Sequence, residues 1–144
     1  MCDIIIREVD TEDSERVCVI SSEDLGYPCE VSLVRRKIGS LDHASEEVFV
    51  AEVDGVVAGY IHIERFEVLY FESMANVLGL AVDSSYRRMG IGKALISKAE
   101  KWCLDNGIGV IRLNSGSTRT GAHKFYAGLG YDNDKEQKRF IKRL

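Results

Sequence analysis

The stretch of sequence that decides the fold is Asn76-Val77-Leu78-Gly79-Leu80-Ala81-Val82-Asp83-Ser84-Ser85-Tyr86-Arg87-Arg88-Met89-Gly90-Ile91-Gly92-Lys93. Residues 76–82 are largely apolar without alternation, which predicts a strand buried on both faces. Beyond Gly90, apolar residues recur at helical spacing. The first N–H groups of a helix lack helical partners and carry partial positive charge, to which Arg87, Arg88 and Lys93 add full charges. The stretch therefore predicts a strand, an anion-binding loop and a helix.

Two familiar phosphate motifs do not match this loop. A P-loop requires glycine where Arg87 stands, and it requires serine or threonine where Ala94 stands. A Rossmann fingerprint requires a third glycine beyond Gly92. On these residues alone, an anion site and a glycine-rich turn that only starts a helix are equally good interpretations.

Composition and charge set the class of the protein. The chain has 144 residues, of which 45% are hydrophobic and 29% charged, as expected for one globular domain covering residues 1–144. A net charge of −4 argues against a general nucleic-acid binder. No apolar run approaches membrane length and no signal-peptide pattern is present, so we expect a cytoplasmic protein without a membrane partner. The four cysteines have no metal-ligand spacing, and we expect reduced thiols and no metal.

The other elements can be placed around the central stretch. Asp54-Gly55 predicts a hairpin turn, and Gly59 in the second strand indicates a bulge or a close approach of backbone. The remaining elements expected are a strand at 4–6, helices at 11–22 and 30–41, hairpin strands at 48–53 and 56–66, a strand at 109–114, a helix after residue 118, and a final hairpin within 131–141. The order β-α-α-β-β-β-α-β-α-β-β predicts an α/β mixed sheet with helices on both faces.

Two motifs in this chain resemble the signatures of one family. Arg-x-x-Gly-x-Gly at residues 87–92, preceded by Leu80-Ala81-Val82-Asp83, resembles the acyl-CoA signature of the GNAT superfamily of N-acetyltransferases. The segment from Ala122 to Tyr131 resembles that family's second signature, AxxFYxxxGF, with tyrosine in the last place. The motifs stand in the expected order, and the element order matches over essentially the whole chain.

The resemblance implies a fold with splayed central strands and a role for each part of both motifs. Acetyl-CoA is the implied co-substrate, and a backbone N–H near Val82 would polarise its carbonyl. Tyr126 would protonate the departing thiolate, because a phenol with a pKa of about 10 holds its proton at neutral pH; without the motif, a tyrosine beside Phe125 on an apolar helix face is usually a core residue. The residues implied to bind the cofactor are Leu80, Ala81, Val82, Arg87, Arg88, Met89, Gly90, Ile91, Gly92, Lys93, Arg119 and Tyr126.

The chain also departs from the family pattern. Some members have glutamate as general base where Asn76 stands, and an amide cannot act as a base. Many members have asparagine where Arg119 stands, which leaves Arg119 to pair with CoA phosphates or with a carboxylate. His123 either faces solvent or contacts CoA. The candidates left open for the base are Glu64, His62, Glu72, Glu67 and Glu23 or Asp24.

The function expected from the sequence is transfer of an acetyl group from acetyl-CoA to a primary amine of a small-molecule acceptor. Two alternatives stay open: a non-catalytic acyl-CoA-binding or regulatory module, suggested by the absent carboxylate at Asn76, and a protein N-acetyltransferase. A nucleotide-triphosphate-binding domain is disfavoured, since magnesium ligands are missing. The identity of the acceptor and the presence of a homodimer are left open.

Overall fold

A computed structural model describes residues 3–116 and 119–144 of the chain. The chain forms two compact units, Met1–Leu113 and Asn114–Leu144, and each unit is described by itself. A single domain over residues 1–144 stays a prediction.

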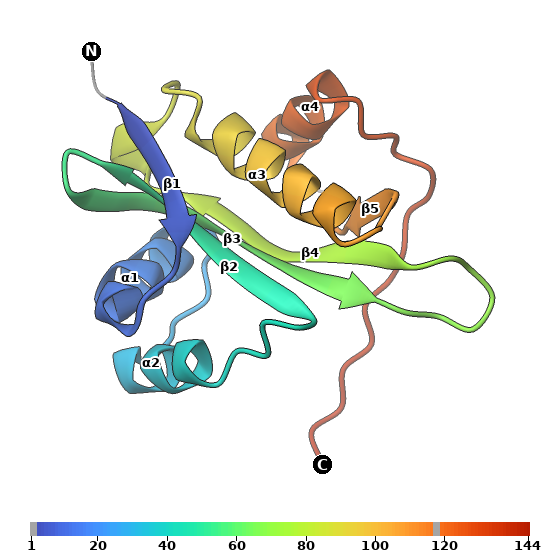
Figure 1. The fold of residues 1–144 in the computed structure, drawn as a ribbon, viewed down its shortest axis with the longest axis horizontal. Helices are drawn as coiled ribbons and strands as arrows, with labels where there is room; N and C mark the ends of the chain where they lie inside the picture. The colour runs from blue at the N-terminus through green and yellow to red at the C-terminus, as the bar shows by residue number, and fades with distance from the viewer. Residues whose placement is uncertain (1–2, 117–118) are drawn as a thin grey trace. The chain divides into compact units, whose positions relative to one another are not determined.

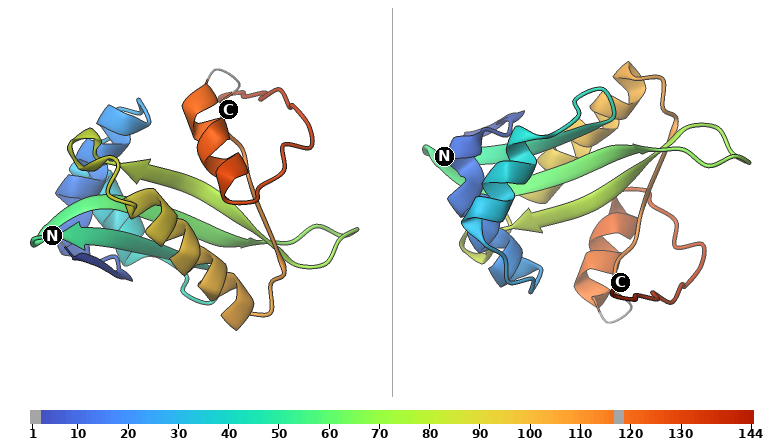
Figure 2. Two further views of the ribbon diagram at one scale, coloured as in Figure 1. Left: turned by 90° about the horizontal axis from the view of Figure 1, so that it is seen from above. Right: turned by 90° about the horizontal axis from the view of Figure 1, so that it is seen from below.

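The first unit is a five-stranded sheet with helices on both faces. Neighbouring strands follow the order β1-β2-β3-β4-β5; all pairs are antiparallel except β4 with β5, which is parallel. Helices α1 and α2 cover one face and α3 crosses the other, as Figures 1 and 2 show. The elements are β1 (Ile4–Glu8), η1 (Thr11–Asp13), α1 (Ser14–Asp24), α2 (Val31–Gly39), β2 (Glu46–Val53), β3 (Val56–Phe66), β4 (Met74–Val82), η2 (Ser84–Tyr86), α3 (Ile91–Asp105) and β5 (Val110–Leu113).

The hairpin of β2 and β3 forms as predicted, with a bulge. Asp54 and Gly55 have φ angles of 50° and 79°, the left-handed values that a two-residue hairpin turn needs. The register then shifts, because Glu52 pairs with Val57 but Ala51 pairs with Gly59, which leaves Ala58 as the extra residue. Every side chain of β3 beyond this point changes face relative to an unbroken ladder.

Gly59 also lets α3 approach the sheet closely. A Cβ atom at Gly59 would lie 2.9 Å from the Ala81 carbonyl oxygen and 3.1 Å from Cγ2 of Ile91. Ile91 is the first residue of α3 and is 2% exposed. The start of α3 is therefore packed directly over β3 and the end of β4, which confirms the predicted close approach.

The strand β5 is shorter than β4 and pairs with only the first part of it. β5 pairs with Met74–Val77 of β4, and in the described residues it pairs with none of residues 78–82. β4 itself carries a bulge, since His62 pairs with Gly79 and Ile63 with Val77, leaving Leu78 unmatched. The last residues of β4 thus present an edge that β5 does not cover, as the family resemblance implied.

The second unit contains α4 (Thr120–Gly128). The predicted helix is confirmed, but the predicted final hairpin is wrong, because residues 131–144 contain no strand. Phe140 and Ile141 are 91% and 69% exposed. A two-stranded hairpin without a buried face is marginal in water, and these side chains supply no such face.

Candidate active site

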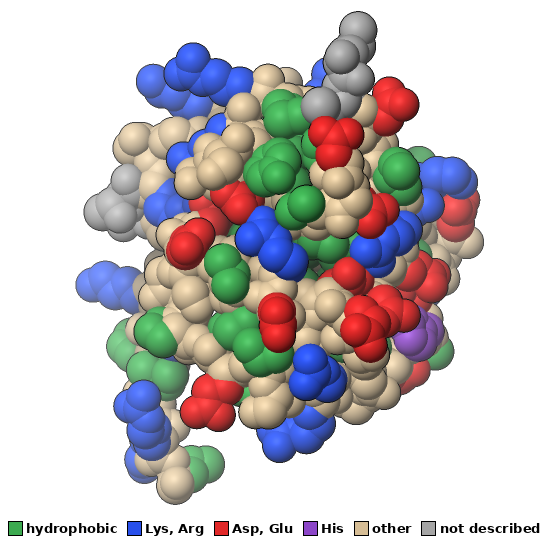
Figure 3. Space-filling view, turned by 90° about the vertical axis from the view of Figure 1, so that its left-hand side faces the viewer, with side chains coloured by type: hydrophobic (Ala, Val, Ile, Leu, Met, Phe, Trp, Pro, Cys, Tyr) green, Lys and Arg blue, Asp and Glu red, His purple; other side chains and the backbone are tan. Residues whose placement is uncertain are grey.

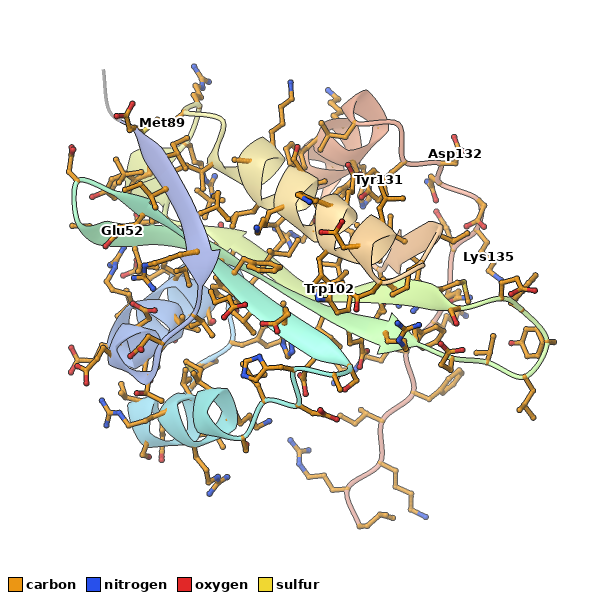
Figure 4. All side chains as sticks on the ribbon, in the orientation of Figure 1. Glu52, Met89, Trp102, Tyr131, Asp132 and Lys135 are labelled. Atoms are coloured by element: carbon orange, nitrogen blue, oxygen red, sulfur yellow. The ribbon has the colours of Figure 1, made fainter. Side chains whose placement is uncertain are left out.

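The loop before α3 is shaped by two residues with left-handed backbone. Arg88 has a φ of 66° and Gly90 a φ of 82°, and Gly90 is the N-cap of α3. Buried Ile91 then anchors the helix, while Arg87, Arg88 and Lys93 remain exposed. Figure 4 labels Met89 in this loop and Trp102 further along α3. The structure therefore brings the basic side chains of residues 87–93 to one exposed turn, as the sequence predicted.

The N-terminus of α3 presents backbone donors in the same turn. The first helical hydrogen bond runs from the Ala94 N–H to the Gly90 carbonyl at 3.0 Å. The N–H groups of Ile91, Gly92 and Lys93 precede it and so have no acceptor within the helix. Gly90 makes no side-chain cap. Backbone donors, a helix of 15 residues and three cations are the features that favour a pyrophosphate-like anion at such a turn.

The end of β4 is connected to α1 by a partly buried ion pair. Asp83 accepts from Nη2 of Arg16 at 2.6 Å and from the Ser85 N–H at 2.9 Å. The hydrogen bond from Arg16 is the main reason that the pKa of Asp83 is lowered. Nε of Arg16 also donates to the Val57 carbonyl of β3 at 2.9 Å. This contact fixes where β4 stops and the loop begins, and Arg16 was not found from the sequence.

Asp24, the last residue of α1, faces the predicted cofactor donors. Its carboxylate accepts from Nη2 of Arg87 at 2.7 Å and from the Val82 N–H at 3.4 Å, and its side chain is 10% exposed. Val82 is the residue whose N–H was expected to polarise the acyl carbonyl. Asp24, considered from the sequence only as a base, is thus an internal acceptor for two donors of the cofactor site.

The remaining candidates for the base differ in what they contact. Glu64 accepts through Oε2 from the side-chain amide of Asn76 at 3.1 Å. Asn76 also accepts from Nη1 of Arg112 at 2.8 Å, so its amide bridges a carboxylate and a guanidinium. Glu67 forms an ion pair with Arg65 at 3.5 Å. Glu23 and Glu72 are exposed.

His62 lines a cavity between the helices and the sheet. Its Nε2 lies 2.7 Å from Oε1 of Glu46, and the two side chains are 28% and 26% exposed. The cavity has a volume of about 250 Å³ and lies between α1, α2 and the sheet. Its apolar walls are formed by Val17, Leu33, Val34, Ile38, Leu41 and Val48. Its polar lining is Ser21, Tyr27, Cys29, Lys37, Tyr60 and His62.

Two cysteines meet beside this cavity. Sγ of Cys29 lies 2.8 Å from Sγ of Cys18, and both thiols are free. Cys18 is 6% exposed, and its hydrogen bond with Cys29, together with burial, raises its pKa to about 11. The sequence spacing gave no signal for this pair, because the turn between α1 and α2 brings the two residues together.

The second unit holds the other predicted site residues. Tyr126 on α4 is half-buried, with its ring centroid 5.2 Å from that of Phe125 and 6.0 Å from that of Tyr131. Arg119 is exposed and is the N-cap residue of α4. Nε2 of His123 lies 2.9 Å from the Gly116 carbonyl oxygen, so His123 contacts its own unit as well as solvent. The structure brings residues 80–93 together in the first unit, and Arg119, His123 and Tyr126 in the second.

Within residues 3–116 and 119–144, no three His, Cys, Asp or Glu side chains cluster as metal ligands would. None of the helices described there has the length and apolarity needed to cross a membrane. Acidic and basic side chains are interspersed over the face drawn in Figure 3.

Comparison with known proteins identifies the family. Residues 14–131 match the model of the Acetyltransferase (GNAT) family, and the chain belongs to this family. The resemblance found in the sequence is thereby confirmed, and by class the chain is an acyltransferase of the N-acetyltransferase type.

Individual relatives match this chain either at low sequence identity or over a short segment. An uncharacterised N-acetyltransferase of Chlorobaculum tepidum is 28% identical over 132 residues, covering 90% of this chain and 76% of that protein. The acetyl transferase GW6a of rice, Oryza sativa subsp. japonica, is 54% identical over 37 residues, which are 26% of this chain and only 9% of that protein. The crystal structure of the aminoglycoside N-acetyltransferase AAC(6')-Iy with CoA superposes with a TM-score of 0.83 at 19% identity, covering 100% of this chain and 97% of that one. That likeness shows that the fold is shared.

Proposed function

We propose that this protein transfers the acetyl group of acetyl-CoA to a primary amine of a small molecule. The observation that carries the proposal is the uncovered edge of β4, which leads directly into the anion-binding turn of α3. An elongated ligand with an amide-containing arm and a pyrophosphate fits this arrangement. Its arm would hydrogen-bond along the strand edge, and its pyrophosphate would lie at the basic turn. The family match and the CoA-bound structural neighbour support the same ligand.

The residues present suit acetyl-CoA, which supplies a thioester-activated acetyl group when bound. The backbone of Leu80, Ala81 and Val82 would hold the pantetheine arm along the edge that β5 leaves unpaired, while residues 87–93 would hold the phosphates. The Val82 N–H would donate to the acyl oxygen in place of Asp24, its acceptor in this structure. Asp24 would at the same time release Arg87 to the pyrophosphate.

Tyr126 is proposed as the proton donor to the leaving thiolate. Replacing Tyr126 by Phe removes only the hydroxyl group, so we expect turnover to fall about 100-fold while the Kd for CoA stays within twofold. Turnover is measured from free thiol, and the Kd by calorimetry. Tyr131→Phe is the matched control, because it removes a hydroxyl from the adjacent ring of the same unit. If Tyr126→Phe turned over at the wild-type rate, Tyr126 would have no place in the mechanism.

A non-catalytic acyl-CoA-binding module is the second candidate. It is favoured by one observation, the engagement of Asn76 with Glu64 and Arg112 where some relatives carry a carboxylate base. Release of CoA thiol on addition of any amine from a broad panel decides for the enzyme. Acetyl-CoA binding without thiol release across the panel decides for the module. The cytoplasmic location stays a prediction, and the presence of a homodimer stays open.

A further inference from the structure

The cavity under α1 and α2 lies beside the open part of β4. Its polar floor comes from β3, where Tyr60 pairs with Ala81 and His62 pairs with Gly79. A Cβ atom at Gly79 would be 3.7 Å from the Tyr60 hydroxyl oxygen, so the phenol reaches across onto β4. The floor is therefore the cross-strand neighbour of the residues that precede Val82.

The lining suits an apolar body with few charges. Six aliphatic side chains form the walls, and among the described residues that line the cavity there is no carboxylate; the Glu46 carboxylate is taken up by its contact with His62. The charged side chain at the lining is Lys37, which is exposed. A molecule with several ammonium groups would lose hydration here without gaining anionic partners, which costs several kcal/mol per buried charge. One amine on an alkyl or arylalkyl body avoids that cost.

The floor also contains one group that can accept a proton. With Nε2 of His62 donating to Glu46, the imidazole keeps Nδ1 as an acceptor, and the hydrogen bond to Glu46 orients the ring. Tyr60 is unsuited to this role, because its hydroxyl is bonded to Ser21 at 2.6 Å and burial raises the pKa of its phenol. The other titratable groups facing the cavity are Tyr27 and Cys29 from the α1–α2 connection and Lys37 from α2.

We propose that this cavity binds the acceptor as a monoamine on an apolar body, and that His62, oriented by Glu46, removes the ammonium proton before acyl transfer. The inference rests on the proposed acetyltransferase function. One proton passes from the ammonium group to His62, and the neutral nitrogen forms its bond to the acyl carbon as the carbon–sulfur bond breaks. The nitrogen then loses a second proton to solvent, the CoA thiolate gains one proton, and His62 releases its proton to solvent, so one proton is released for each acetyl group transferred.

Substrate preference tests the cavity. We expect 2-phenylethylamine to show a kcat/KM at least tenfold above kanamycin and spermidine in the free-thiol assay. A higher kcat/KM for either polycation would overturn the assigned class. A protein that binds acetyl-CoA but releases thiol with no amine would instead sink the proposed function, and calorimetric binding of 2-phenylethylamine would still decide whether the cavity takes an apolar amine.

Filling the cavity tests its location. Val34→Phe adds volume to an apolar wall, so we expect at least tenfold weaker binding of 2-phenylethylamine and an unchanged Kd for acetyl-CoA. Val19→Phe, on the exposed side of α1, is the matched control. The unchanged acetyl-CoA affinity also reports folding, and Ile38→Phe replaces Val34→Phe if the latter fails to fold. Wild-type amine binding in a folded, filled variant would place the acceptor elsewhere.

The pH profile tests His62. His62→Gln should lower kcat/KM about 100-fold at pH 7, and the deficit should shrink above about pH 9, where more of the amine is already neutral. His43→Gln is the control, because His43 makes an equivalent pair with Glu47 at 2.8 Å but is not among the lining residues. Glu46→Gln should shift the same profile with a smaller loss. A deficit that is constant with pH would show a structural role and overturn the assignment.

Discussion

The anion-binding turn and the apolar cavity lie near one strand but are built in opposite ways. The turn is made by consecutive residues, 87–93, and its donors are mostly backbone N–H groups and exposed cations. The cavity is made by side chains from α1, α2, β2 and β3, which lie far apart in the sequence. A site of the first kind depends on backbone conformation, whereas a site of the second kind depends on packing.

The sharpest way to test this difference is to change backbone conformation alone. Gly90→Val places a β-branched residue at a φ of 82°, which costs about 1–3 kcal/mol. If the turn distorts to relieve that strain, CoA binding should weaken by about 5–100-fold, with 2-phenylethylamine binding unaffected. Both affinities are measured by calorimetry.

A matched control lies at the other end of the same helix. Gly107 follows α3 with a φ of 72°, so Gly107→Val imposes similar strain away from the turn. It should lower stability without changing CoA affinity. Equal losses of CoA affinity in both variants would mean that global destabilisation, rather than the conformation of the turn, controls the cofactor site.

A smaller effect is expected at the ion pair that connects the two regions. Arg16 on α1 lowers the pKa of Asp83 at the end of β4, so the pair stabilises the fold above the unfolded pKa of about 3.9. That contribution is lost as pH falls through the lowered, folded pKa. Arg16→Gln should therefore cost on the order of 1–2 kcal/mol at pH 7. Near pH 3 the difference from wild type should be smaller.

Urea unfolding at the two pH values measures this difference. Lys101→Gln is the control, because it removes an ion pair with Asp105 whose side chains are 67% and 61% exposed. An Arg16→Gln deficit equally large at pH 3 would show that the arginine acts through its bond to the Val57 carbonyl.

The same contrast explains what the sequence could predict. The turn, the strand before it and the helix after it were all predictable, because a glycine pattern, an apolar run and a helical period are local signals. The final hairpin was not, since Phe140 and Ile141, the apolar residues expected to close it, are 91% and 69% exposed.

The pairing of His62 with Glu46 shows a second limit. An unbroken ladder from the Asp54-Gly55 turn would put Ile61, not His62, opposite Val48. The extra residue at Ala58 shifts the register by one and turns His62 towards the cavity. Glycine at position 59 suggested a bulge, but its direction and length depend on how α3 packs on β3. The sequence therefore left the base open among several carboxylates and one histidine, and the register is the basis on which His62 is proposed.

The smallest effect is expected from added salt, which should weaken ligand binding at the charged turn more than in the apolar cavity. Exposed Arg87, Arg88 and Lys93 attract a pyrophosphate through solvent, and added salt screens such interactions beyond about 3 Å at 1 M. Raising NaCl from 0.05 to 0.5 M should weaken CoA binding roughly three- to tenfold. Binding of 2-phenylethylamine to the cavity should weaken by less than about twofold, because burial of its apolar body is not screened. Equal salt dependence of both ligands would show that the amine is held by surface charge, and the comparison between a charged turn and an apolar cavity would fail.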